Sequence, residues 1–253
     1  MYAVLLALSP AFAAPRAEPV SWSYGGTSFA GYVVYDDATT TPRPGVVMVP
    51  NWRGVTPAAV EKAKGIAGSR YVVLVADVYG KDLRPTDDAQ SAAAAGALYK
   101  DRPLLRGRAN AAVETLRSQK GVPLDPSHIG AIGFCFGGAT VLEMARSGAD
   151  LDGVVSFHGA LDTSARAATG SLKTPIMVLH GAADTYVSPT DVTAFQKEMT
   201  DAGADWQLVA FSGAVHCFTE VGATAPACAY DARTAKRAYE MMGDFFSETF
   251  AAP

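Results

Sequence analysis

The chain has 253 residues, 49% of them hydrophobic, and its 21 Lys and Arg against 25 Asp and Glu leave a formal net charge of −4. This composition is that of an ordinary globular protein and excludes a disordered chain. The mildly acidic balance argues against a nucleic-acid-binding protein, which needs a basic surface to neutralise phosphates, and no apolar run reaches the roughly 18 residues of a membrane span.

The N-terminal segment 1–14 resembles a secretory signal peptide. It reads MYAVLLALSPAFAA, an apolar stretch followed by Pro10 and a small-large-small sequence at 11–13 that is typical of a cleavage site. No Lys or Arg precedes the apolar stretch, so an ordinary apolar segment is the alternative. The signal-peptide hypothesis predicts a periplasmic or secreted protein, and the alternative a cytoplasmic one.

Residues 15–253 read as a single α/β domain. Short apolar runs rich in β-branched residues alternate with helical patterns, as in βαβ units around a mostly parallel sheet with helices on both faces. The predicted strands are 29–35, 46–49, 71–76, 129–134, 153–157, 175–180 and 207–211. The predicted helices are 57–67, 102–119, 139–146, 189–202 and 232–250, with 87–97 as a further, weakly periodic one.

The strand at 129–134 runs directly into the sequence Gly-Phe-Cys-Phe-Gly-Gly at 133–138 and then into a helix. This is the G-x-S-x-G nucleophile-elbow pattern with Cys135 in place of serine. The turn is sharp, so only glycine leaves room at Gly133 and Gly137. The N-terminus of the following helix favours a thiolate at Cys135. The pattern predicts a nucleophilic cysteine, and the alternative is an inert buried thiol.

Two partners follow in the chain order nucleophile, acid, histidine. Asp184 comes after the strand at 175–180, and His216 comes after the last predicted strand. Each lies just past the carboxyl end of a strand, where open α/β sheets place their sites. Taken singly, each has a plainer interpretation as a turn or surface residue. Together they favour a Cys135–His216–Asp184 triad, with Asp77 as the rival acid.

The remaining histidines are expected to have different surroundings. His158 ends the strand at 153–157 and is a candidate for substrate contact. His180 is expected beneath the loop that carries the acid, and His128 at the opposite end of the sheet.

Cys217 and Cys228 lie close in sequence, across a loop that contains Gly and Pro. They could pair in an oxidising compartment or remain two small thiols. Sequence alone leaves both open, because a disulfide requires the two Cα atoms to lie within roughly 7 Å.

At these residues the sequence resembles the dienelactone hydrolase family, a branch of the α/β-hydrolases with a Cys–His–Asp triad. The motifs that carry the resemblance are ADVYG at 76–80, GFCFGG at 133–138, SFHG at 156–159, HGAAD at 180–184 and VHCF at 215–218. The resemblance covers nearly all of the chain after the N-terminal segment. It implies an α/β-hydrolase fold and hydrolysis of a small enol-lactone or related ester through an acyl-cysteine, without metal or cofactor.

The α/β-hydrolase pattern also predicts an oxyanion hole. The backbone N–H of Phe136 is one donor, and a second is expected from the loop after the strand at 46–49, with Trp52 as the candidate. In the mechanism, His216 takes the thiol proton of Cys135 and Asp184 fixes the imidazole tautomer.

One position departs from the family pattern. Members with dienelactone activity usually carry a Glu where this chain has Asn51, so the dienelactone substrate itself is left open. The family's acidic substrates call for a cation, and Arg53 is the best candidate, with Arg84 and Arg106 behind it. Tyr79, with Trp52 and Phe136, is expected to wall an apolar pocket or to be plain core.

Two other function classes compete with the enzyme. A hydrolase scaffold can serve as a non-catalytic binding protein. A free Cys135 in an oxidising compartment could act as a redox sensor, with Cys217 as the resolving thiol. A complete set of three triad residues favours the ester or lactone hydrolase.

Overall fold

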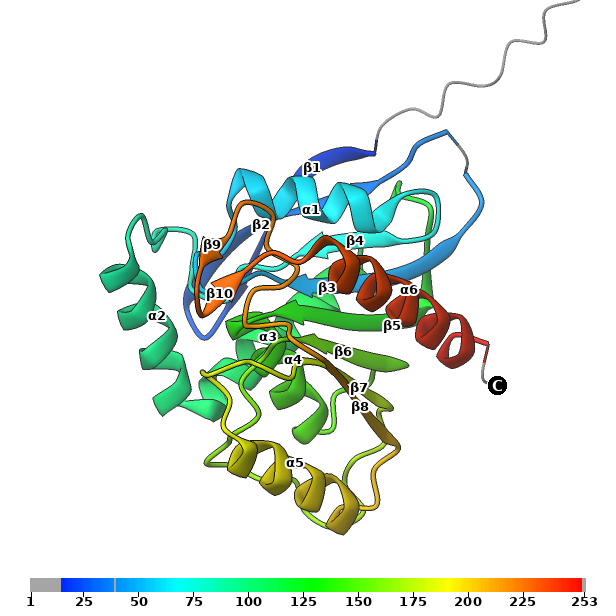
Figure 1. The fold of residues 1–253 in the computed structure, drawn as a ribbon. Coiled ribbons are helices and arrows are strands. Elements are labelled where there is room, and N and C mark those ends of the chain that lie inside the picture. The colour runs from blue at the N-terminus through cyan, green and yellow to red at the C-terminus, as the bar shows by residue number, and fades with distance from the viewer. Residues whose placement is uncertain (1–14, 39, 252–253) are drawn as a thin grey trace, which may run out of the picture.

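An eight-stranded sheet forms the centre of the computed structural model, which describes residues 15–38 and 40–251 (Figure 1). The predicted signal peptide lies outside the described residues. The strands are β1 (Arg16–Tyr24), β2 (Thr27–Tyr35), β3 (Arg43–Val49), β4 (Val72–Val75), β5 (Leu124–Phe134), β6 (Gly153–Phe157), β7 (Ile176–Gly181) and β8 (Trp206–Phe211). Their order is β1-β2-β4-β3-β5-β6-β7-β8, and from β4 to β8 every neighbouring pair is parallel.

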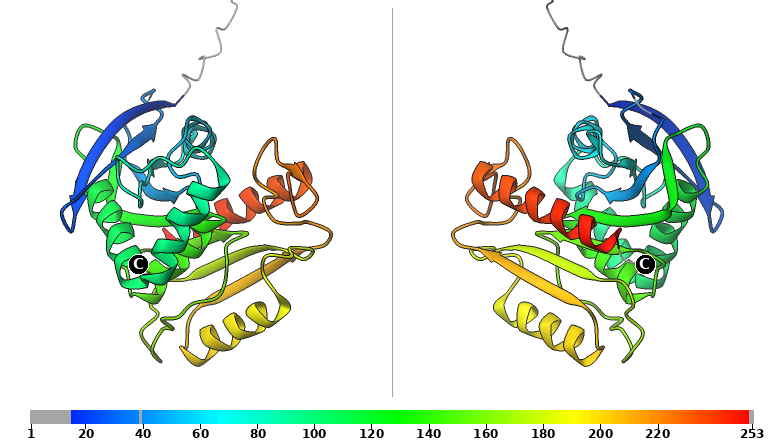
Figure 2. Two further views of the ribbon diagram at one scale, coloured as in Figure 1. Left: turned by 90° about the vertical axis from the view of Figure 1, so that its left-hand side faces the viewer. Right: turned by 90° about the vertical axis from the view of Figure 1, so that its right-hand side faces the viewer.

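Helices cover both faces of the sheet, as predicted (Figure 2). They are α1 (Pro57–Ala67), α2 (Asp88–Lys100), α3 (Arg102–Arg117), α4 (Phe136–Arg146), α5 (Pro189–Asp201) and α6 (Ala232–Thr249). Apolar side chains of α1 and α6 pack on one face, and those of α2 to α5 pack on the other. β4 and β6 are buried throughout because helices cover both of their faces, and such strands favour apolar residues, with Ser156 as the polar exception in β6.

The strand that sequence reasoning missed is β1. It pairs antiparallel with β2 along its whole length, and the two are joined by a tight turn at Gly25 and Gly26, both with positive φ. A Gly-Gly pair between two strands is a hairpin signal, because both turn positions need the left-handed conformation. A short hairpin of β9 (Thr224–Ala225) and β10 (Cys228–Ala229) was also not predicted. It lies in the segment between β8 and α6, beside α1 (Figure 1).

Helix boundaries agree closely where caps are strong. The Thr56 hydroxyl accepts from the N–H of Ala59 at the start of α1, and Ser188 with Asp191 forms a capping box at the start of α5. The weakly periodic segment at 87–97 is helical and continues as α2 to Lys100.

The predicted start of α4 at 139 is wrong, because the helix begins at Phe136. Gly137 and Gly138 lower helix propensity and so hid the first turn. In the structure they are required by close packing. A Cβ on Gly137 would lie 2.0 Å from the carbonyl oxygen of Val49 at the end of β3.

None of the helices in the described residues is both long enough and apolar enough to cross a membrane.

Candidate active site

The turn between β5 and α4 presents Cys135 at the carboxyl edge of the sheet. Cys135 has φ 54° and ψ −114°, a strained conformation for a side-chain-bearing residue, and it is partly exposed. A Cβ on Gly133 would lie 2.0 Å from the carbonyl oxygen of Gly137. The glycine requirement deduced from the elbow pattern is therefore physical: any side chain there would force the turn apart.

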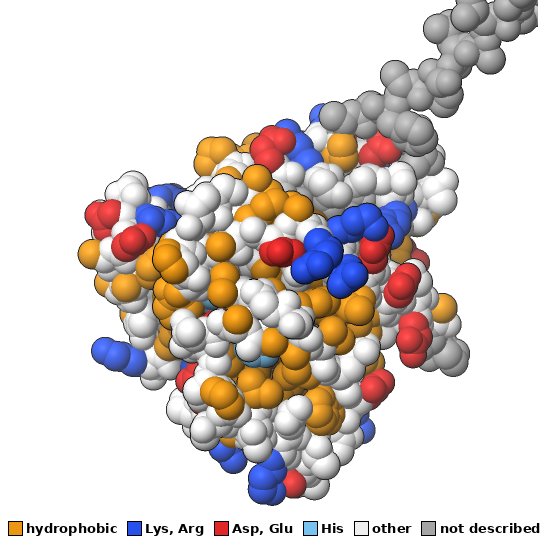
Figure 3. All heavy atoms as spheres, viewed as in Figure 1, with side chains coloured by type: hydrophobic (Ala, Val, Ile, Leu, Met, Phe, Trp, Pro, Cys, Tyr) orange, Lys and Arg blue, Asp and Glu red, His pale blue; other side chains and the backbone are white. Residues whose placement is uncertain are grey.

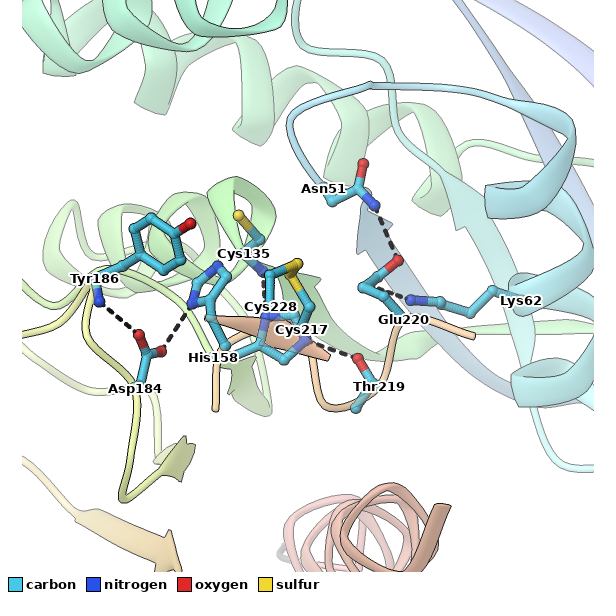
Figure 4. The surroundings of a disulfide bond; sticks show 11 residues. Asn51, Lys62, Cys135, His158, Asp184, Tyr186, Cys217, Thr219, Glu220 and Cys228 are labelled. Atoms are coloured by element: carbon cyan, nitrogen blue, oxygen red, sulfur yellow. Dashed lines mark hydrogen bonds and ion pairs between the residues drawn. A yellow bond between two sulfur atoms is a disulfide. The ribbon is translucent and has the colours of Figure 1, made fainter. Parts of the chain in front are cut away.

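Asp184 and His216 meet at the same edge, from the loops that follow β7 and β8. His216 Nδ1 lies 2.8 Å from one carboxylate oxygen of Asp184, and the other oxygen accepts the backbone N–H of Tyr186 at 2.8 Å. Cys135 lies close enough to His216 to interact electrostatically with its imidazole. Figure 4 draws Cys135 and Asp184 with a dashed line for the hydrogen bond that Asp184 makes with His216. The structure thus brings the three predicted residues together.

The charges of the pair stabilise one another. Burial lowers the pKa of His216, but the hydrogen bond with Asp184 and the interaction with Cys135 outweigh it and raise the pKa to about 10. Burial raises the pKa of Asp184, and the hydrogen bond and charge of His216 bring it below its usual value. At neutral pH the site therefore holds an imidazolium next to a carboxylate.

One face of His216 is covered by the aromatic ring of Tyr186. The ring centroids are 5.0 Å apart in an edge-to-face arrangement, and Tyr186 is 65% exposed. Figure 3 shows histidine atoms at the surface of the molecule, among hydrophobic side chains near the middle of the view. Sequence reasoning did not single out Tyr186.

The candidate oxyanion donors lie where β3 approaches α4. Phe136 is the first residue of α4, so its N–H is among those that have no acceptor within the helix. In the β3–α1 loop, Asn51 Oδ1 accepts the N–H of Arg53, and the Asn51 carbonyl accepts that of Gly54. Neither of these two hydrogen bonds uses the backbone N–H of Trp52. The role of Trp52 as the second oxyanion donor stays a prediction.

Asn51 connects to a partly buried ion pair that sequence reasoning missed. Its Nδ2 donates to Glu220 Oε2 at 2.9 Å, and Glu220 pairs with Lys62 of α1 (Figure 4). Lys62 Nζ lies 4.0 Å from the ring centroid of Phe134. Burial lowers the pKa of Lys62, against the opposing effect of Glu220. No sequence signal links Lys62 and Glu220, which are far apart along the chain.

A cavity of about 690 Å³ opens behind this pair, between α1, α6 and the segment after His216. Of the predicted site residues, Asn51 lines it, whereas the side chains of Cys135, Asp184 and His216 do not. The described cavity is therefore separate from the thiol.

The candidate cation is already paired. Arg53 makes an ion pair with Asp88 and lies over the Trp52 ring at 5.8 Å. The two weaker candidates also have carboxylate partners, Arg84 with Asp77 and Arg106 with Glu143.

Tyr79 belongs to the hydrophobic core. Its ring is buried against Phe136, with the centroids 5.2 Å apart, and its hydroxyl donates to the carbonyl of Trp52 at 3.0 Å. It braces the β3–α1 loop against the start of α4.

Asp77, the rival acid, holds a turn. Its carboxylate accepts backbone N–H groups of Ala30, Tyr79 and Gly80 and pairs with Arg84 at 3.0 Å. It is 1% exposed, so no imidazole can take these places without breaking the turn.

The expectation that His158 contacts substrate is not matched by its position. Its side chain is fully buried, with one ring nitrogen facing the N–H of Cys135 and the other facing Thr219. His180 is buried where expected, and His128 lies in β5, 3.8 Å from Asp152.

Cys217 and Cys228 form a disulfide, with their Cα atoms 4.9 Å apart. This settles the alternative that the sequence left open. The cross-link closes the loop directly after His216, where the N–H of Ala229 also donates to the His216 carbonyl at 3.0 Å.

Comparison with known proteins gives a consistent result. The family model of the dienelactone hydrolase family matches residues 29–250. The chain is 36% identical over 153 residues to an uncharacterised Caenorhabditis elegans protein, covering 58% of this chain and 95% of that one. It is 26% identical to a probable 2-oxo-3-(5-oxofuran-2-ylidene)propanoate lactonase of Bradyrhizobium, covering 70% of this chain and 74% of that one.

Among solved structures, a dienelactone hydrolase-like promiscuous phosphotriesterase from metagenomic libraries superposes with a TM-score of 0.86. The two are 36% identical, over 94% of this chain and 99% of that one. The chain belongs to the dienelactone hydrolase family, with the α/β-hydrolase fold, and is a hydrolase of carboxylic esters or lactones.

Proposed function

We propose that this protein hydrolyses activated esters or lactones with Cys135 as the nucleophile, His216 as acid and base, and Asp184 as the group that orients His216. The observation that carries the proposal is the position of the His216 imidazole, which is hydrogen-bonded to the buried Asp184 carboxylate and lies close enough to Cys135 to interact with it electrostatically. The strained turn under Cys135 and the N-terminus of α4 support the same role.

The chemistry proceeds in two steps. The Cys135 thiolate adds to the ester carbonyl carbon, and the carbonyl oxygen takes the negative charge, held by the N–H groups of Phe136 and Trp52. The carbonyl re-forms, the ester C–O bond breaks, and the leaving alkoxide or enolate takes a proton from His216. Neutral His216 then removes a proton from water, which attacks the thioester and releases the acid and the thiolate.

The substrate is expected to be an ester with a good leaving group. A thiolate is readily expelled from a tetrahedral intermediate, so an amide nitrogen competes poorly as leaving group. Two similar proteins are named as a probable lactonase and as a promiscuous phosphotriesterase, and the lactonase name supports a lactone as substrate here. Asn51 is bonded to Glu220 rather than standing as a free carboxylate beside the thiol, which separates this site from dienelactone specificity.

The competing function classes receive less support. A redox sensor needs a resolving thiol, and Cys217 is bonded to Cys228. A non-catalytic binding protein has no use for an imidazole whose pKa is raised to about 10 beside a partly exposed thiol.

The disulfide also supports export from the cytoplasm, because such bonds persist in oxidising compartments. We propose on this ground that segment 1–14 is a signal peptide and that the mature enzyme is periplasmic or secreted. Mass spectrometry of the protein isolated from its native cells tests this: a mature N-terminus near residue 15 is expected, and an intact N-terminus contradicts it.

Hydrolysis of p-nitrophenyl acetate tests the catalytic proposal. We expect Cys135→Ala and His216→Ala each to lower kcat by about 10⁴-fold or more with the fold intact by circular dichroism. Cys135→Ser keeps the shape and is expected to retain only weak activity. Full activity of Cys135→Ala would contradict the proposal.

A further inference from the structure

Backbone strain in the described part of the chain is concentrated around the thiol. Cys135, His158 and Cys217 are its three non-glycine residues with positive φ, at 54°, 39° and 63°. They lie in three separate loops, after β5, β6 and β8. Such conformations persist only where the surroundings enforce them, and they gather at functional sites.

The two ring nitrogens of His158 have different partners in two of these loops. Nδ1 lies 3.2 Å from the backbone nitrogen of Cys135 and accepts its N–H, which it shares with the carbonyl oxygen of Phe157 at 3.0 Å. Nε2 must then carry the proton, and it donates to the Thr219 hydroxyl at 2.7 Å. Burial lowers the pKa of His158 well below its ordinary value, so the ring is neutral, with one donor and one acceptor nitrogen.

Packing fixes the ring in this place. His158 lies edge-to-face against His216 and Phe218, with centroid distances of 5.1 Å and 5.0 Å. The next residue, Gly159, lies under the first turn of α4, where a Cβ would be 2.6 Å from the backbone nitrogen of Ala139. The ring is fully buried and closed to substrate.

We propose that His158 is a positioning residue: through Thr219 it ties the backbone of Cys135 to the loop that carries His216, and so sets the distance between thiol and imidazole. The inference rests on the proposed function of Cys135 and His216. The disulfide between Cys217 and Cys228 also constrains the loop that carries His216.

The test breaks the link at Thr219, because Thr219→Val keeps the shape and removes only the hydroxyl. We expect kcat for p-nitrophenyl acetate to fall about tenfold or more with KM nearly unchanged, since a small misplacement of reacting groups costs up to about 10²-fold. Thr219→Ser restores the hydroxyl and is expected to restore kcat. Tyr239→Phe is the matched control: it removes a hydroxyl from a nearby aromatic that packs against Phe134 and Phe157, and it should leave kcat within about twofold.

Two readouts separate positioning from general damage. A looser imidazole has a lower pKa, so the alkaline limb of the pH–rate profile should move to lower pH in Thr219→Val. His158→Asn, which tolerates the left-handed φ but cannot reach Thr219, should lower kcat to a similar extent. The double variant should lose little more, because both changes break one link.

Alkylation by iodoacetamide tests positioning without turnover, because Cys135 is the free cysteine of the three. Thr219→Val is expected to slow alkylation at neutral pH by several-fold, as less thiolate is present. Folded Thr219→Val with wild-type kcat, alkaline limb and alkylation rate would overturn the inference. Absence of any Cys135-dependent hydrolysis in the wild type would instead overturn the proposed function and leave the alkylation result to decide on positioning.

Discussion

Two of the sets of opposite charges in the described residues differ in what else is nearby. In one, Glu143 of α4 is fully buried and pairs with Arg106 and Arg146, while Arg146 also pairs with Glu198 of α5. Every charge in this set has a partner of the opposite sign, and the set joins α3, α4 and α5 behind the sheet.

The second set is the Asp184–His216 pair, with a similar separation of 2.8 Å. It adjoins a partly exposed thiol on a strained turn at the carboxyl edge of the sheet. Burial and ion pairing are therefore common to both sets and do not mark a site. The distinguishing features are an accessible nucleophile and a backbone held in an unfavourable conformation.

The largest effect on activity is expected from a substitution of Asp184. Asp184→Asn keeps the shape but removes the charge that holds the His216 proton, and we expect kcat to fall by about 10⁴-fold, as in other hydrolytic triads. His216 is protonated below its pKa of about 10, so the alkaline limb of the wild type should lie near pH 10. In Asp184→Asn this limb should move to lower pH. A limb that stays in place would contradict the assigned role of Asp184.

Glu143→Gln is the corresponding substitution in the set of charges around Glu143. It removes the carboxylate that pairs with Arg106 and one of the two that pair with Arg146, and we expect the free energy of unfolding to fall by about 3–5 kcal/mol. Activity per folded molecule should stay near that of the wild type. Urea denaturation measures the loss, with Glu240→Gln as the control, because the exposed Glu240–Lys236 pair should contribute less than about 1 kcal/mol. A larger effect on kcat than on stability would place Glu143 in the site.

The disulfide lies next to His216, but we expect it to act mainly on stability. Replacing both Cys217 and Cys228 by Ser should lower the free energy of unfolding by about 2–4 kcal/mol. Without the cross-link, which joins residues 11 positions apart, the unfolded chain gains conformational entropy. The same denaturation experiment measures it. The wild type treated with dithiothreitol should show the same shift, and an unchanged midpoint in both would contradict a stabilising role.

Asn51→Glu is expected to have the smallest effect. It places a second carboxylate beside Glu220, and one of the two should bind a proton more tightly. The pH–rate profile of acylation should then gain an ionisation on its acidic side, with a change in rate of a few-fold. Asn51→Gln, which stays neutral, is the control. An unchanged profile would count against any role for this position.

Sequence alone predicted the triad because each of its members is marked by local signals. Cys135 has close-packed glycines around it, and Asp184 and His216 each follow an apolar strand. Parallel strands bring their carboxyl ends to one edge, so the three residues had to be neighbours if the strand assignments were right. The predicted strands were confirmed, and their carboxyl ends bring the three residues to one edge of the sheet.

The parts that escaped prediction depend on contacts between distant segments. Lys62 and Glu220 form an ion pair across 158 positions, and His158 reaches Thr219 across 61. No local periodicity encodes such pairs. For the same reason His158 was expected to face substrate: its place at a strand end was foreseen, but the direction of its side chain depends on a positive φ that the sequence does not mark.

The most direct test is to trap the acyl-enzyme. The mature protein is mixed with p-nitrophenyl acetate, quenched in acid within the first turnover, digested and analysed by mass spectrometry. We predict an acetyl group on the peptide that contains Cys135, accumulating more strongly in a variant whose deacylation is slowed. Rapid hydrolysis with an unmodified Cys135, or an acetyl group found on another residue, would contradict the account.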